Sequence, residues 1–284
     1  MEKPEGLNRR HLLTLAGGLC VAGTLPARAD APGLPFDLTG QFVQSGYGIG
    51  RATPLAELWV DGKLQGLTSN SGWFYVGFDR DSGPSCQITV KTSTGEDSAV
   101  LAIASTAYDI QRVDGLPQDT VTPTAPALLE RIKREAELKA AAFASRTDAD
   151  AFKGGFAYPL DNFRVSGHFG NQRVLNGTPA SPHMGFDMAA PTGTPIHAPQ
   201  DGLVVLAESD LFYEGGLILI DHGQGLISMY LHQSEVIAQK GQTVAKGQLI
   251  GKVGAKGRAT GPHLCWRLKW GNRHMDPSLM VTQA

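Results

Sequence analysis

Residues 261–266 read Gly-Pro-His-Leu-Cys-Trp, and this stretch decides how the second half of the chain is interpreted. Successive side chains of a β-strand point to opposite faces, so His263 and Cys265 would share one face and Leu264 and Trp266 the other. One face would then carry two side chains that can bind a metal, while the other face is apolar. The pattern predicts a strand that contributes to a reactive site on one side and to a core on the other.

Two further fragments carry the same kinds of residue. The fragment His183-Met-Gly-Phe-Asp187 places an imidazole and a carboxylate four residues apart, a spacing that can bring both onto one cation, and Tyr230-Leu-His232 adds another histidine. His, Asp and Cys are all zinc ligands, and three protein ligands that leave a fourth position open are typical of a catalytic zinc. The three fragments together predict a catalytic zinc site.

These fragments resemble the lysostaphin-like (LytM-type) zinc metallopeptidases, whose pattern is His-x-x-x-Asp, then Tyr-x-His, then Thr-Gly-Pro-His-Leu-His. The resemblance covers about Tyr158 to Met280. It implies that His183 and Asp187 bind Zn²⁺, that the second residue of the His-x-His pair is the third ligand, and that His263 works with His232 in catalysis. It also implies that the substrate is a peptide bond in the stems of peptidoglycan, cut during cell-wall remodelling.

The sequence departs from this pattern at the third ligand, where Cys265 stands in place of histidine. A thiolate is a competent ligand, with a Zn–S distance of ~2.3 Å against ~2.0–2.1 Å for Zn–N. One histidine, an aspartate and a thiolate neutralise Zn²⁺, whereas two histidines and an aspartate leave one positive charge. We therefore expect a less acidic bound water and slower hydrolysis than with histidine.

Two alternatives to a Cys265 ligand stay open. In the first, the site is degenerate and the domain is an envelope regulator, either an amidase activator or a peptidoglycan-binding protein, whose partner is an envelope amidase or a divisome protein. In the second, Cys265 forms a disulfide with Cys86 in an oxidising compartment. Cys86 otherwise fits a small buried residue on a strand.

Proton transfer in such a site falls to the histidines. No glutamate stands beside His183, unlike in the helical His-Glu-x-x-His enzymes. His232 and His263 are therefore the candidates to take a proton from water and to hydrogen-bond the developing oxyanion, and the sequence does not decide which does which.

The first half of the chain has a different pattern. Short apolar-polar alternations, at residues 56–60, 73–78, 86–91 and 99–104, are separated by turns such as Asp61-Gly62. This spacing predicts an immunoglobulin-like β-sandwich over residues 34–118, with a binding or spacing role. A helix over 127–144, with Thr124 as cap and Pro126 in its first turn, defines a helical linker over 124–150. Its charged pairs Glu130/Arg134 and Glu135/Lys139 favour an exposed helix whose apolar positions dock within the chain. Residues 156–284 form the LytM-type domain, an antiparallel β-sheet, so the whole protein is predicted to be mainly β.

The first 29 residues read as a secretory signal peptide. Basic residues precede an apolar run from Leu12 to Leu25, and the small residues Ala27 and Ala29 follow it. Arg9-Arg10 resembles a twin-arginine signal, and ordinary export is the alternative. We expect cleavage after Ala29 and a periplasmic or secreted protein that has no membrane span after cleavage.

Composition excludes several classes of protein. The chain has 35 glycines and 17 prolines among 284 residues, which argues against a long helical bundle. A net charge of −2 gives no reason to expect a nucleic-acid partner, and three cysteines are too few for a disulfide framework. Nothing indicates a cofactor other than zinc.

Overall fold

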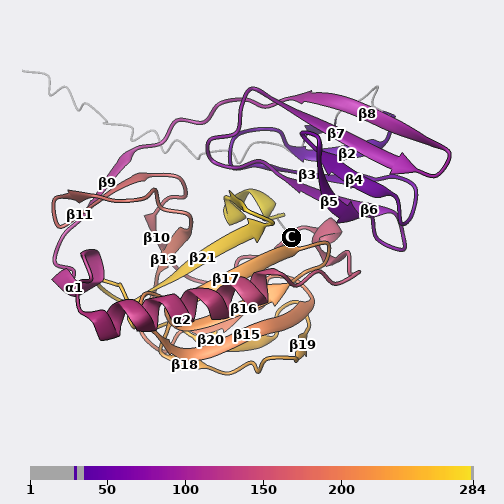
Figure 1. Cartoon of the computed structure of the whole chain (residues 1–284). Coiled ribbons are helices and arrows are strands. Elements are labelled where there is room, and N and C mark those ends of the chain that lie inside the picture. Colours follow the sequence, from indigo (N-terminus) through magenta and orange to yellow (C-terminus); the bar gives the residue numbers. More distant parts are fainter. Residues whose placement is uncertain (1–28, 31–34, 283–284) are drawn as a thin grey trace, which may run out of the picture.

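The computed structural model describes residues 29–30 and 35–282, and within these ranges the chain is mainly β (Figure 1). It contains several small N-terminal sheets, a helix and a large antiparallel sheet. The predicted signal peptide, with Cys20 and the arginine pair, lies outside the described residues except for Ala29. No helix in the described ranges is long and apolar enough to cross a membrane.

The N-terminal part consists of two four-stranded sheets with the orders β1-β2-β3-β6 and β5-β4-β7-β8, all antiparallel. Strands alternate between exposed and buried residues, as in β7, because one face of each sheet packs inward. The strands are β1 (Ala29–Asp30), β2 (Asp37–Gln41), β3 (Tyr47–Arg51), β4 (Glu57–Val60), β5 (Lys63–Leu67), β6 (Trp73–Gly77), β7 (Ser85–Thr92) and β8 (Gly95–Ala102). The four strands expected from the alternating pattern are β4, β6, β7 and β8.

The segment after β8 crosses to the C-terminal part. It contains β9 (Ile110–Val113) and the short helix α1 (Gln118–Val121). β9 belongs to neither N-terminal sheet, and it pairs in parallel with β11 (Gln172–Leu175), which also pairs with β12 (Thr178–Pro179). Residues predicted to end the first domain therefore form an edge beside the later part of the chain.

The long helix α2 (Pro126–Phe143) agrees with the predicted helix in its position and differs in its cap and charge pairs. Its N-cap is Ala125 without a side-chain hydrogen bond, so the prediction of Thr124 as cap is wrong; Pro126, which fixes φ in the first turn, begins the helix. Glu130 and Arg134 form the expected pair at 4.0 Å. The Glu135/Lys139 pair is wrong, because Glu135 pairs with Arg131 one turn earlier in the same helix and Lys139 pairs with Glu214 outside the helix.

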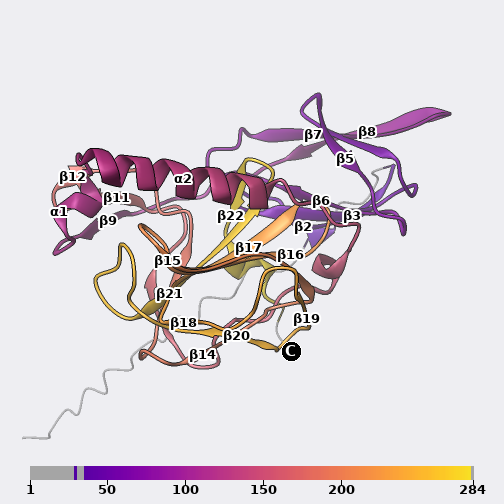
Figure 2. The same ribbon diagram turned by 60° about the horizontal axis from the view of Figure 1, so that its bottom comes forward.

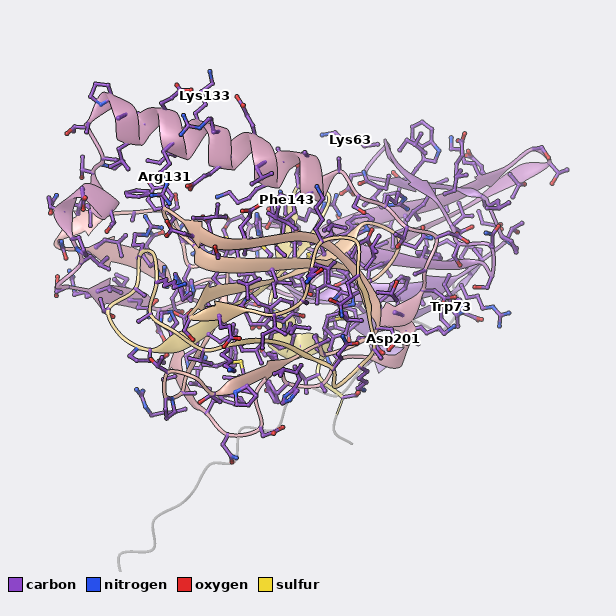
Figure 3. The ribbon with its side chains drawn as sticks, turned by 90° about the horizontal axis from the view of Figure 1, so that it is seen from below. Lys63, Trp73, Arg131, Lys133, Phe143 and Asp201 are labelled. Carbon is purple, nitrogen blue, oxygen red and sulfur yellow. The ribbon has the colours of Figure 1, made fainter. Side chains whose placement is uncertain are left out.

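Contacts outside the helix hold α2 on the large sheet. Glu135, which also pairs with Arg131 of the same helix, accepts a hydrogen bond from the backbone N–H of Phe212, and Lys139 pairs with Glu214. The apolar side chains Leu138, Ala142 and Phe143 pack on the sheet's buried residues, and Figure 3 shows Phe143 on the sheet side of the helix and Lys133 on its outer side. Docking of the helix within the chain is confirmed.

The large C-terminal sheet has eight antiparallel strands in the order β10-β13-β21-β17-β16-β15-β19, with β22 also paired to β21. Figure 2 shows α2 on one side of this sheet and a three-stranded sheet, β14-β20-β18, on the other. The elements are β10 (Arg164–Gly167), β13 (Phe186–Ala189), β14 (Pro195–His197), β15 (Gly202–Leu211), β16 (Gly215–Asp221), β17 (Leu226–Gln233), β18 (Glu235–Val236), β19 (Thr243–Val244), β20 (Leu249–Lys252), β21 (His263–Trp270), β22 (Arg273–Met275) and the 3₁₀ turns η1 (Ala151–Gly154) and η2 (Pro277–Met280). Every residue of β16 and β17 is buried, because both faces of the sheet are covered.

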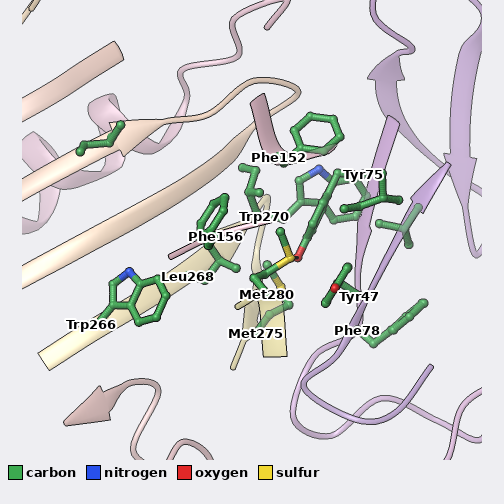
Figure 4. Close-up of a cluster of buried hydrophobic side chains, with 14 of the residues drawn as sticks. Tyr47, Tyr75, Phe78, Phe152, Phe156, Trp266, Leu268, Trp270, Met275 and Met280 are labelled. Carbon is green, nitrogen blue, oxygen red and sulfur yellow. Dashed lines mark hydrogen bonds between the residues drawn. The ribbon is translucent and has the colours of Figure 1, made fainter. Parts of the chain in front are cut away.

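One apolar core runs through the N-terminal sheets and the C-terminal part. Tyr75 on β6 lies with its ring centroid 5.7 Å from that of Phe152 and 6.2 Å from that of Trp270, and its hydroxyl is 3.7 Å from the sulfur of Met280 (Figure 4). All four side chains are almost fully buried. Arg273 adds an ion pair of 3.1 Å with Asp61 across the same boundary. The two parts are therefore packed as one body.

A buried histidine makes this packing sensitive to acid. His222 is fully buried; its Nδ1–H donates to the carbonyl of Asp201 and its Nε2 accepts from the Ser228 hydroxyl, both at 2.7 Å. Burial lowers the pKa of His222 from 6.5 to about 4. A second proton must therefore enter an apolar site that solvates it poorly.

We expect stability to fall as the pH drops from about 6.5 towards 4, because the unfolded chain binds the proton first. At pH 5 the contribution of His222 amounts to about 2 kcal/mol. Denaturant unfolding at pH 7.5 and pH 5 should show a smaller acid-dependent loss for His222→Gln, which keeps one donor and one acceptor. An equal loss in both proteins would contradict this assignment.

Candidate metal centre

The candidate ligands meet on neighbouring strands β13 and β21. Asp187 and Cys265 lie directly opposite each other in the antiparallel register, so their side chains share a face of the sheet, and His183 lies four residues before Asp187. One donor atom from each of the three residues lies within 4.8 Å of the others, and all three side chains are buried. His263 is on the same face two residues before Cys265, whereas Leu264 and Trp266 enter the apolar core on the other face.

The contact between His183 and Asp187 is the observation that tests whether a cation fits. His183 Nδ1–H donates to the carbonyl of His168 at 3.2 Å, which leaves Nε2 with an electron pair. That Nε2 lies 3.1 Å from Asp187 Oδ1, a buried oxygen that accepts no hydrogen bond, and 3.5 Å from Cys265 Sγ. His183 Nε2 and Asp187 Oδ1 therefore face each other with electron pairs and no proton between them, an arrangement that a bound cation would satisfy. The residues present therefore fit a metal of the zinc type.

Two arginines contact the acidic members of this cluster. Arg173 Nη2 lies 3.2 Å from Asp187 Oδ2, and Arg267 Nε donates to Cys265 Sγ at 3.3 Å. Burial alone would raise the pKa of Asp187, but His183, His263 and Arg173 outweigh it, and the pKa lies well below its usual range. Burial raises the pKa of the Cys265 thiol to about 12 despite the opposing effect of Arg267. Without a metal, Asp187 is thus the charged member and Cys265 is protonated.

His263 and His232 stand beside the cluster in the same tautomer as His183. His263 Nδ1–H donates to the carbonyl of Gly261 at 2.9 Å, and His232 Nδ1–H donates to that of Lys256 at 2.8 Å. Their ring centroids are 4.7 Å apart. These bonds leave Nε2 as the ring nitrogen that no backbone carbonyl occupies, and His263 Nε2 is 3.9 Å from Asp187 Oδ1. Backbone carbonyls thus orient all three imidazoles in the same way.

His232 reaches this face only because its strand is irregular. Leu231 lies opposite Cys265, so strict alternation would turn His232 to the far side with Tyr230. The β16–β17 register has one extra residue on β17 between Tyr230 and Gln233, and His232 has φ +66°, in the left-handed region. Such a bulge re-aims a side chain. Burial and the neighbouring His263 lower the pKa of His232 to about 3, so its imidazole is neutral.

An open groove of about 320 Å³ runs past these histidines. Asp187, His232 and His263 line it, together with Arg164, Arg173, Arg258, Gln111 and the loop of residues 259–262. Among the described residues, Arg164 and Arg258 form no ion pair with a carboxylate. The groove therefore has uncompensated positive charge next to the candidate metal centre.

Three other side chains considered for the site, His222, Tyr230 and Cys86, lie away from the ligand cluster. His222 and Tyr230 face the opposite side of the sheet, where both hydroxyl and imidazole contact Ser228. Cys86 is free and buried on β7, and Cys265 is also free, so the alternative of a Cys86–Cys265 disulfide is wrong; the two lie in different sheets. Arg267 was missed by the sequence analysis, although its position two residues after Cys265 on a strand places it on the same face.

Comparison with known proteins identifies the C-terminal part. Residues 181–277 match the model of Peptidase family M23. The peptidoglycan DD-endopeptidase ShyA of Vibrio cholerae is 42% identical over 113 residues, which are 39% of this chain and 26% of ShyA. The DD-carboxypeptidase/endopeptidase Mpg of Neisseria meningitidis is 36% identical over 126 residues, 44% of this chain and 29% of Mpg. The chain thus matches only about a quarter of the length of these curated relatives.

One solved structure resembles most of the chain. A crystal structure from Pseudomonas aeruginosa assigned to peptidase M23 superposes with a TM-score of 0.65 at 29% identity, over 84% of this chain and 95% of that protein. The similarity therefore extends beyond the family match and includes the N-terminal sheets. The resemblance to the lysostaphin-like peptidases is confirmed for residues 181–277.

Close packing around Cys265 gives a direct test of this geometry. A Cβ atom on Gly185 would lie 2.7 Å from Cys265 Sγ and 2.9 Å from Arg267 Cγ, whereas one on Gly261, beside the same groove, would meet nothing within 4 Å. We expect Gly185→Ala to lower the free energy of unfolding by about 1–3 kcal/mol through overpacking. Gly261→Ala is the matched control and should stay within about 0.5 kcal/mol of wild type. Equal stability of the two variants in denaturant unfolding would show that the pocket around Cys265 is looser than described.

Proposed function

We propose that this chain, whose residues 181–277 belong to peptidase family M23, is a zinc-dependent endopeptidase that hydrolyses peptide cross-links of peptidoglycan. The observation that carries the proposal is the facing pair of unprotonated atoms, His183 Nε2 and Asp187 Oδ1, 3.1 Å apart and next to Cys265 Sγ. In this proposal His183, Asp187 and Cys265 hold Zn²⁺. His232 and His263 are the catalytic residues.

The substrate assignment is supported by the relatives and by the charge of the groove. ShyA is named a peptidoglycan DD-endopeptidase and Mpg a DD-carboxypeptidase/endopeptidase, and this chain aligns with them over 113 and 126 residues. Stem peptides carry free carboxylates, and Arg164 and Arg258 line the groove without an acidic partner. An anionic peptide would supply the missing partners.

Zn²⁺, when bound, supplies a Lewis acid that polarises the scissile carbonyl and lowers the pKa of a coordinated water. The protein's own contribution is the placement of two unprotonated Nε2 atoms at the groove, on His232 and His263. Either atom can accept the proton of an attacking water. Once protonated, the same Nε2 is a hydrogen-bond donor, so it can stabilise the oxyanion or return the proton to the leaving amine.

We also infer the working division of the chain and its location. Residues 1–29 act as the export signal, and an immunoglobulin-like sandwich over 34–118 with the helical segment 124–150 supports the peptidase domain of 156–284. The N-terminal sheets carry no cluster of metal-binding side chains among the described residues, which favours a spacing or binding role. Action on peptidoglycan places the mature protein in the periplasm or outside the cell.

The proposal is tested with purified mature protein and cross-linked muropeptides. We expect cleavage into monomers, its loss on removal of the metal by a chelator, and its recovery when Zn²⁺ is returned, because the polarising charge is required. Product analysis by mass spectrometry identifies the bond. Intact muropeptides in the presence of stoichiometric bound zinc would instead support the alternative of a regulator that binds peptidoglycan or an amidase.

The His263→Ala variant separates an effect on catalysis from an effect on metal binding. We expect His263→Ala to lower kcat by about 10²–10⁴-fold, the usual contribution of a general acid or base, while the zinc content stays at one per chain. His197→Ala, a histidine of β14 outside the groove lining, is the control and should keep wild-type turnover. Loss of zinc from His263→Ala would mean that His263 is a ligand and that its role is misassigned.

A further inference from the structure

The cysteine at the third ligand position has a charged partner of its own. Arg267 follows Cys265 by two residues on β21, so both side chains lie on the same face, and Arg267 Nε donates to Cys265 Sγ at 3.3 Å. None of the ion pairs within the described residues includes Arg267, and the nearby Asp187 is paired with Arg173. The guanidinium is therefore directed at the sulfur and not at an acid.

The net charge of Cys265 and Arg267 together equals that of a histidine ligand. A metal-binding cysteine is a thiolate with one negative charge, and an arginine in a protein always carries one positive charge. The thiolate and guanidinium together are neutral, as a histidine ligand is by itself. Because Asp187 and Arg173 are the same in either case, the Cys265–Arg267 pair would leave the centre with the same net charge as a histidine at position 265 would.

We propose that Arg267 is a positioning residue for Cys265, and that the Cys265–Arg267 pair acts as the electrostatic equivalent of a histidine zinc ligand. The inference rests on the proposed function, because it takes Cys265 to be a ligand. It replaces the expectation from the sequence alone that the thiolate makes bound water less acidic. It also explains why an arginine occupies the inner side of a strand next to a cation site, where by itself it would repel the metal.

Close packing around Cys265 and Arg267 supports their pairing. Gly185 approaches both side chains so closely that a Cβ atom there would lie 2.7 Å from Cys265 Sγ and 2.9 Å from Arg267 Cγ. A residue without a side chain at this position leaves room for the sulfur and the guanidinium together. Each anionic ligand then has one arginine: Arg173 for Asp187 and Arg267 for Cys265.

The proposal predicts that the effect of Arg267 on metal affinity reverses with the ligand at position 265. With cysteine present, Arg267→Met should weaken Zn²⁺ binding by about 10–100-fold, as is usual when a ligand loses its outer partner. In Cys265→His, the arginine faces a neutral ligand and only repels the cation, so adding Arg267→Met should strengthen Zn²⁺ binding. The four proteins are compared by chelator competition with Zn²⁺ itself.

Two controls distinguish this effect from general damage. Arg258→Met removes another arginine of the groove that does not contact Cys265, and it should shift Zn²⁺ affinity in the same direction in both backgrounds. Arg267→Lys keeps the positive charge, so it should retain higher Zn²⁺ affinity than Arg267→Met. This difference should remain even where both substitutions lower the stability of the fold. A change of equal sign and size for Arg267→Met in the two backgrounds would overturn the proposal.

Cobalt substitution tests the ligand and its partner separately. Co²⁺ bound to the wild-type protein should show the near-ultraviolet charge-transfer band of a cobalt–thiolate bond, and Cys265→His should lack it. In Arg267→Met the band should move to longer wavelength, because a thiolate without its hydrogen bond donates electrons more readily. Absence of the band in wild type would overturn both this inference and the ligand set of the proposed function. A band that is present but insensitive to Arg267→Met would overturn the role of Arg267 alone.

Discussion

The two-sided burial of strand β21 is the constraint on which the rest of the structure depends. Its even-numbered residues, among them Trp266 and Trp270, enter an apolar core that continues into the N-terminal sheets. Its odd-numbered residues His263, Cys265 and Arg267 face the candidate metal centre. A shift of one residue in register would exchange the two sets and lose both the core and the site. The large apolar side chains therefore fix the position of the reactive ones.

Backbone carbonyl groups orient the histidine rings of the site. Three imidazoles donate Nδ1–H to carbonyls of loops or strand ends, so each presents Nε2 without any help from a second acidic side chain. This arrangement depends on loop conformation, and in His232 it also depends on a left-handed residue at a bulge. The local strain at His232 is compensated by the hydrogen bond of its own N–H to the carbonyl of Glu214, at 2.7 Å.

The sequence allowed the regular parts of this arrangement to be predicted and missed the parts set by tertiary contacts. The shared face of His263 and Cys265 follows from the period of a strand, and the opposed core face follows with it. His232 breaks that period, so only the resemblance, not alternation, placed it at the site. Glu135 and Lys139 have the spacing of a helical pair, but Glu135 pairs with Arg131 of the same helix and Lys139 pairs with Glu214 outside it. Arg267 was missed because a charged residue on a strand usually faces solvent, whereas here its guanidinium donates a hydrogen bond to the buried sulfur of Cys265.

The core shared by Tyr75, Phe152, Trp270 and Met280 has a consequence for how the groove meets its target. Since the N-terminal sheets share one core with the strand that carries the site, the C-terminal part does not move independently of them. The groove reaches a target bond only when the whole molecule rotates and translates. For the cross-linked peptidoglycan substrate proposed above, the bonds within reach would then be set by pore size and by the outline of the entire molecule, as well as by the chemistry of the groove.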